Sequence, residues 1–180
     1  MDLYLNPTIC QKCGGACCKR YPGAAFPDDI TRNYGKDMLA ALVSAFRDGY
    51  TIDCREGELG DGYPRTSGYR EDDDYEEYYE ADDGYHQGLY VRPRCSEDNN
   101  SCLYNYHTYN GQCLFLTDTG CKLAPELRPT GCRMLEPKIG KGKCEVHGGD
   151  KLNSARAWWD HYEVITQAAK LVERELLELV

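Results

Sequence analysis

The sequence predicts a small α+β domain with two helical regions, one short β-hairpin and several cysteine-rich loops. Apolar residues recur every three or four positions near 29–48 and again near 154–178, which indicates two amphipathic helices. Short apolar runs between turn residues indicate strands in the region that separates them. Because 180 residues fit one domain of ordinary size, we expect a single domain over residues 1–180.

The two helices are expected to begin at polar caps and to bury one face each. Asp28 or Asp29 can cap the first helix, and Gly49 is expected to stop it. Its apolar face comprises Met38, Leu39, Leu42, Val43 and Phe46. Asn153 or Ser154 can cap the second helix. That helix carries a stripe that either packs on the domain or meets another subunit: Trp158, Tyr162, Ile165, Ala169, Val172 and Leu176.

Strands are expected in two places. Residues 88–94 fit a strand that ends at Pro93, and residues 111–123 fit a β-hairpin. In that hairpin the apolar run 114–116 is followed by a turn at 117–120, which places Cys113 and Cys121 on opposite arms. The segment 124–137 is expected to form a proline-bounded loop or a single helical turn.

An acidic insertion rich in Tyr and Gly is expected near residues 55–90. Residues 56–83 hold twelve Asp or Glu against Arg65 and Arg70, a balance of -10, whereas the whole chain carries -9. We interpret this run as a solvated face, with a surface that binds a partner or a cation as the alternative. A nucleic-acid-binding protein would show a basic face, so we expect no nucleic-acid partner.

The N-terminal residues and the cysteine content bear on the cellular compartment. MDLYLNPTIC has neither a basic n-region nor an apolar h-region, and no run approaches 18 apolar residues, so we expect a cytoplasmic protein without a membrane partner. Clustered cysteines in a reducing cytosol are more often metal-binding or catalytic than disulfide-linked. An odd total of eleven weakens a full disulfide pairing further.

Four of the cysteines lie within nine residues, in the stretch CQKCGGACC at 10–18. A CxxC pair brings two sulfurs to one ion at an easy loop geometry, which favours metal binding. A thioredoxin-like motif should instead open a helix, and Gly14-Gly15 after Cys13 gives no helix start. A nucleophilic cysteine would need a basic partner, for which composition offers His107, His147 or His161. None of these histidines lies in a recognisable catalytic motif. We interpret them, and also His86, as structural or exposed.

The order of the cysteine motifs resembles that of the YkgJ-type cysteine-cluster family, which is described as a family of zinc- or iron-chelating proteins with a CxxCxxCC signature. The matching elements are CQKCGGACC at 10–18, DI at 29–30, GQCLFL at 111–116, GCKL at 120–123 and RPTGCR at 128–133. The resemblance spans roughly residues 8–136. The chain departs from the signature by having three residues between Cys13 and Cys17, where the signature has two. It also has MLEP after Cys132, where many relatives have a further cysteine.

This resemblance implies a set of metal ligands. They are Cys10, Cys13, Cys17, Cys18, Cys113, Cys121 and Cys132, with Cys144 as an eighth. Arg128 and Arg133 flank Cys132, and we expect them to donate hydrogen bonds to the anionic site. Cys54, Cys95 and Cys102 match no motif of the family.

The expected cofactor is an iron-sulfur cluster or zinc, with a slight preference for the cluster. Structural zinc typically uses two paired knuckles, whereas this chain has one CxxC and a compact run of cysteines. We expect a structural, electron-carrying or accessory module with a protein partner. The alternative is a metal-dependent redox or protein-modifying enzyme, which is less favoured because no carboxylate pair, phosphate loop or dinucleotide fingerprint accompanies the cysteines.

Overall fold

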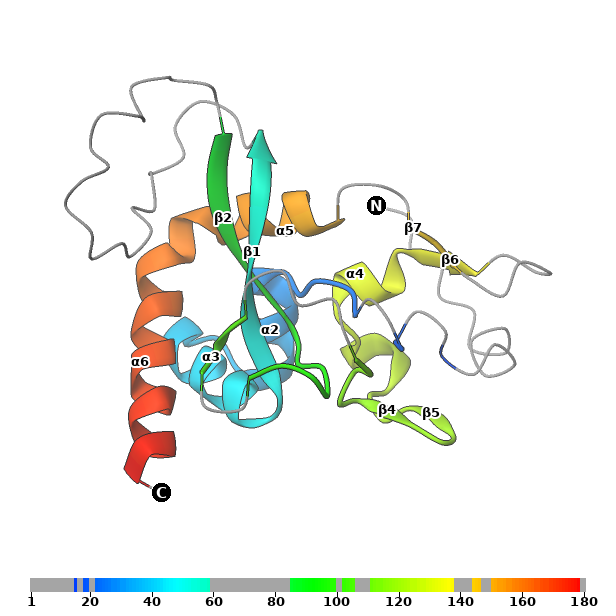
Figure 1. Cartoon of the computed structure of the whole chain (residues 1–180), viewed down its shortest axis with the longest axis horizontal. Helices are drawn as coiled ribbons and strands as arrows, with labels where there is room; N and C mark the ends of the chain where they lie inside the picture. Colours follow the sequence, from blue (N-terminus) through cyan, green and yellow to red (C-terminus); the bar gives the residue numbers. More distant parts are fainter. Residues whose placement is uncertain are drawn as a thin grey trace.

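The computed structural model describes residues 15, 18–19, 22–58, 85–99, 102–105, 111–137, 144–146 and 150–178. In these residues a three-stranded sheet lies among helices, and two small two-stranded ladders lie to one side of it (Figure 1). The predicted α+β class is confirmed. The acidic run beyond residue 58 lies outside the described residues, so its interpretation stays a prediction.

The first predicted helix is in fact two helices, α2 (Pro27–Tyr34) and α3 (Met38–Arg47). The break falls at Gly35, whose φ of +111° belongs to a region that side-chain-bearing residues rarely adopt. Asp37 then starts the second helix, because its side chain accepts a hydrogen bond from the amide of Ala40 at 3.0 Å. The predicted stop is confirmed, since α3 ends two residues before Gly49.

The sheet has the order β2-β1-β3. Strands β1 (Tyr50–Glu58) and β2 (Tyr85–Pro93) pair antiparallel, with Ile52 opposite Val91, and β3 (Tyr104–Asn105) joins β1 in parallel. Strand β2 confirms the predicted strand, but β1 was missed and the predicted insertion began too early, at residue 55. The reason is burial on both faces: residues 51–54 are all buried, so no alternation of polar and apolar residues marks the strand.

The predicted hairpin is present as β4 (Leu116–Thr117) and β5 (Gly120–Cys121). Its turn falls where it was expected, but the arms are shorter. Leu114 is 45% exposed and precedes the first strand, and Cys121 pairs with Leu116 rather than facing Cys113. Cys121 lies on the second arm as expected, but Cys113 lies before the first arm and not on it.

A short helical stretch and a second two-stranded ladder follow. The 3₁₀ turn η1 (Pro125–Leu127) and the single-turn helix α4 (Thr130–Arg133) confirm the predicted proline-bounded turn. Strand β6 (Leu135–Pro137) then pairs antiparallel with β7 (Cys144–Val146), which places the backbone of Cys144 opposite that of Pro137.

The C-terminal helical region consists of α5 (Asp150–Trp158), the 3₁₀ turn η2 (Trp159–His161) and α6 (Tyr162–Glu178). The predicted single helix over 154–178 therefore starts earlier and is interrupted by one tighter turn. Helix α6 lies along the edge of the molecule beside α3 (Figure 1). Its buried residues include Ile165, Ala169 and Val172, so the predicted stripe packs on the domain.

A buried ionic network ties β1 and β2 to the segment after them. The Arg92 guanidinium binds Asp53 Oδ2 through Nε and Asp98 Oδ2 through Nη1, each at 2.7 Å, and all three side chains are at most 2% exposed. Burial lowers the pKa of Arg92, but the hydrogen bonds and charges of Asp98 and Asp53 outweigh that effect and leave its pKa above the ordinary value. Arg92 therefore stays charged inside the domain.

We predict that Arg92→Met reduces the free energy of unfolding by about 3–5 kcal/mol, because it leaves two buried carboxylates without their cation. Urea unfolding measures this loss. Arg47→Met is the matched control, since Arg47 pairs with Glu175 at the exposed surface. A loss at Arg92 no larger than the loss at Arg47 would contradict this account of the core.

Candidate metal centre

The described part of the N-terminal cysteine segment lies against the β4–β5 hairpin. The Cys18 carbonyl accepts a hydrogen bond from the Cys113 amide at 2.7 Å. Gly15 has a φ of +72°, and a Cβ at this position would lie 2.5 Å from Cδ1 of Leu116. Gly15 and Cys18 therefore contact the hairpin and the residue that lies shortly before it, respectively.

The chain continues from this contact to the turn that carries Cys132. A Cβ on Gly23 would lie 2.1 Å from the backbone nitrogen of Cys132 and 2.2 Å from the carbonyl carbon of Gly131. The amide of Gly131 donates to the carbonyl of Ala24 at 2.9 Å. Only glycine permits this approach of two backbones, so residue 23 fixes how close Cys132 comes to the N-terminal segment.

One residue further on, Ala25 fastens the same segment to the core. Its amide donates to the Val91 carbonyl of β2 at 2.8 Å. Its carbonyl accepts hydrogen bonds from Ser154 Oγ at 2.8 Å and from Trp158 Nε1 at 2.7 Å, both on α5. The residues that follow the cysteine segment are thus fixed by hydrogen bonds between the sheet and helix α5.

Asp29 links these residues to α4. Its carboxylate is 1% exposed and accepts five hydrogen bonds, two of them from the amides of Phe26 and Thr130. The others come from the Thr130 hydroxyl and from the guanidinium groups of Arg32 and Arg133. The sequence predicted an N-cap at Asp28 or Asp29, but α2 begins at Pro27, and Asp29 instead reaches back to the N-cap amide. Its contact with Thr130 was not predicted.

Two predicted ligands, Cys113 and Cys132, both affect the pKa of one buried tyrosine, Tyr50. Tyr50 is 1% exposed and packs on Phe115, with ring centroids 5.2 Å apart. Burial raises the pKa of Tyr50 above its ordinary value, and the negative charges of Tyr34, Cys132, Asp29 and Cys113 raise it further. Two predicted ligands from separate segments are therefore brought to the same part of the core.

The remaining predicted ligands are only partly visible. Cys121 is half-buried in β5, and Cys144 is placed by its backbone in β7. Cys10, Cys13 and Cys17 lie outside the described residues. Within the described part of the chain, no three His, Cys, Asp or Glu side chains form a group that could hold a metal ion. A centre built from the predicted ligands would therefore need at least one of Cys10, Cys13, Cys17 and Cys144, whose side chains are not among those described.

The two predicted arginine donors have structural contacts. Arg133 Nη2 binds Asp29 and, at 3.0 Å, the Thr130 hydroxyl, while its buried Nε has no hydrogen-bond partner. Arg128 Nε donates to the carbonyl of Leu123 at 3.1 Å. Both side chains thus hold the turn on either side of Cys132, and donation to a thiolate stays a prediction.

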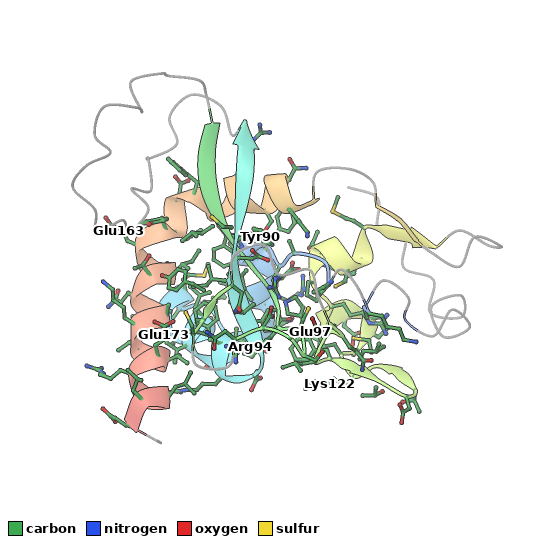
Figure 2. The ribbon with its side chains drawn as sticks, viewed as in Figure 1. Tyr90, Arg94, Glu97, Lys122, Glu163 and Glu173 are labelled. Atoms are coloured by element: carbon green, nitrogen blue, oxygen red, sulfur yellow. The ribbon has the colours of Figure 1, made fainter. Side chains whose placement is uncertain are left out.

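The three cysteines without a motif lie in different surroundings. Cys54 is buried in β1. Cys102 carries a free thiol that donates to Glu173 of α6, with Sγ and Oε1 3.4 Å apart; Figure 2 shows Glu173 on that helix. Cys95 forms an isolated antiparallel bridge with Cys113. This neighbour of a predicted ligand was missed, because its only sequence signal is its place just after the strand that ends at Pro93.

The histidines considered as bases have other contacts or lie outside the described residues. His161 packs edge-on against the Trp158 ring, with centroids 5.8 Å apart. His86 is part of β2, where its backbone pairs with Gly57. His107 and His147 are not among the described residues.

No family model, curated protein or solved structure matches the chain. The YkgJ-type resemblance therefore stays a prediction, and so do the ligand roles that it implies. Among the helices that the structure describes, none is long and apolar enough to cross a membrane.

We predict that Asp29→Asn lowers the free energy of unfolding by about 3–5 kcal/mol, because an amide cannot accept all five donors and leaves two arginines without their carboxylate. Chemical denaturation measures the loss. Asp37→Asn is the matched control, because Asn caps a helix as well as Asp and this cap is exposed. Equal losses at the two positions would show that the contacts of Asp29 with Thr130 and the two arginines add nothing to stability.

We predict that Gly23→Ala costs about 3 kcal/mol or more, because the added methyl must push two backbones apart. Thermal unfolding measures the change. Gly35→Ala adds the same methyl into open space, where only the backbone conformation costs energy, about 1–3 kcal/mol. If Gly23→Ala were no more destabilising than Gly35→Ala, the close contact with Cys132 would not be a constraint.

Proposed function

We propose that the chain is a cysteine-cluster metal-binding protein, with an iron-sulfur cluster or zinc held by ligands from the N-terminal segment, the β4–β5 hairpin and α4. The observation that supports this most directly is the hydrogen bond from the Cys113 amide to the Cys18 carbonyl. It joins two cysteine motifs that are almost one hundred residues apart in the sequence. Ordinary core packing does not require cysteines at such a junction.

The donor set suits a thiophilic metal. Thiolates are the preferred ligands of zinc and of iron-sulfur clusters, and several of them around one centre leave a net negative charge. Arg133 next to Cys132 offers a buried Nε that has no hydrogen-bond partner, which a nearby thiolate would satisfy. When bound, such a centre contributes folding free energy, and an iron-sulfur cluster also supplies electron transfer.

We propose a structural, electron-carrying or accessory role in the cytoplasm, exercised through a protein partner. The contacts around the predicted ligands support a rigid role: Gly23, Ala25 and Asp29 each fasten the cysteine segments to the core through short backbone or charged contacts. A centre held in this way resists rearrangement of its ligands, which suits a structural or electron-carrying site.

We predict that anaerobically purified protein contains stoichiometric iron or zinc by metal analysis, with a visible absorption spectrum in the iron-sulfur case. Cys13→Ser and Cys132→Ser should lose metal and unfold at a lower temperature, because each removes a ligand. Cys102→Ser is the control. This variant should keep its metal, since the wild-type Cys102 thiol donates a hydrogen bond to Glu173.

Two results would contradict the proposal. A wild-type protein that is folded but neither contains nor binds iron or zinc would remove the ligand hypothesis. Equal metal loss from Cys102→Ser and Cys132→Ser would show that the cysteines are wrongly divided into ligands and non-ligands.

A further inference from the structure

Cys95 and Cys113 face each other across two antiparallel segments. The hydrogen bonds flank the pair: the Leu114 amide donates to the Arg94 carbonyl and the Ser96 amide to the Gln112 carbonyl, each at 2.9 Å. Cys95 and Cys113 therefore form a non-hydrogen-bonded pair. In such pairs the Cα atoms are about 4.5 Å apart, and both side chains point to the same face.

This pairing suits two thiolates on one metal. Cβ atoms of directly opposed residues lie roughly 4.5–5.5 Å apart. Zn–S bonds of about 2.3 Å in a tetrahedral site put neighbouring sulfurs roughly 3.8 Å apart, which two such side chains can reach. Cys95 is 1% exposed and Cys113 is 4% exposed, so an ion between them would be shielded from water.

The segment that carries Cys113 also lies between two other segments, those of Cys95 and Cys18. Because its amide does not pair with Cys95, that amide points to the opposite side, where it binds the Cys18 carbonyl. The backbones of Cys95, Cys113 and Cys18 thus lie in a row. Cys95 extends the contact between the N-terminal motif and the hairpin by one further strand.

The surroundings of Cys95 include a hydrogen-bond donor to its sulfur, although burial and two carboxylates favour the protonated thiol. Its Sγ lies 3.8 Å from Nη1 of Arg92, an N–H donor of the kind that supports metal-bound sulfur. Its amide donates to Asp98 Oδ2 at 2.6 Å, which fixes the backbone in place. Burial raises the pKa of this thiol to about 11, Arg92 and Lys151 oppose the rise, and Asp98 and Asp53 add to it. A metal ion would have to displace the thiol proton.

We infer that Cys95 is a metal ligand and shares a metal ion with Cys113. The inference rests on the proposed function and makes it more specific. The family resemblance implies seven cysteine ligands, whereas two centres with four thiolates each need eight. Cys144 was the predicted eighth ligand. Cys95 fills that position because it directly opposes a predicted ligand, whereas the backbone of Cys144 opposes Pro137 in a separate ladder.

The test is a titration of the full, reduced, metal-free chain with Co²⁺, followed through the thiolate-to-cobalt charge-transfer absorption. Cys95→Ser should lower the absorption at saturation and weaken binding by on the order of tenfold or more. Cys113→Ser should do the same, Cys144→Ser should have a smaller effect, and Cys102→Ser is the control. Circular dichroism checks that each variant is folded.

A measurement on the wild type covers the case in which Cys95→Ser does not fold. Iodoacetamide labelling with and without Zn²⁺, read out by peptide mass spectrometry, gives the protection of each thiol. Zinc should protect Cys95 as strongly as Cys113, and more strongly than Cys54, which is buried but not proposed as a ligand.

The outcomes separate this inference from the proposed function. If the wild type binds Co²⁺ and Cys95→Ser binds it equally well with the same spectrum, Cys95 is not a ligand and the proposed function stands. The same holds if zinc protects Cys95 no more than Cys54. A wild-type chain that binds neither Co²⁺ nor Zn²⁺ overturns the proposed function, and the inference with it.

Discussion

The buried carboxylate of Asp29 is the constraint on which the arrangement of the cysteine segments depends. It holds the first turn of α2, the amide and hydroxyl of Thr130, and two arginines around a single charge. A carboxylate with so many donors keeps its position, because any displacement would leave several buried N–H groups unpaired. Helix α4, and Cys132 with it, is therefore fixed relative to the N-terminal segment.

Close backbone contact does the rest of the positioning. Gly23 lets the N-terminal segment touch the backbone of α4, Gly15 lies against the Leu116 side chain of the hairpin, and Ala25 is held between β2 and α5. Because main-chain hydrogen bonds fix direction as well as distance, the N-terminal segment is held against the backbone at Cys113 and against the turn that carries Cys132. This convergence is the physical basis for the proposed metal centre.

Charged side chains of the core also contact the region of the cysteines. Arg92 neutralises part of the charge of Asp53 and Asp98 and also reaches the sulfur of Cys95, so the ionic network of the sheet and the cysteine pair share one cation. Arg133 connects Asp29 to the turn that carries Cys132. Stability of the fold and electrostatic support of a metal site would thus depend partly on the same arginines.

The sequence by itself determined the α+β class, both amphipathic helical regions, strand β2 and the turn at 117–120, because hydrophobic period and turn residues are local signals. It could not show the break at Gly35, because the apolar period continues across it, or strand β1, which is buried on both faces. Only the tertiary structure decided that Asp29 holds Thr130 and that Cys95 opposes Cys113. Those contacts join residues 101 and 18 positions apart, and no local pattern records which distant segment a residue will meet.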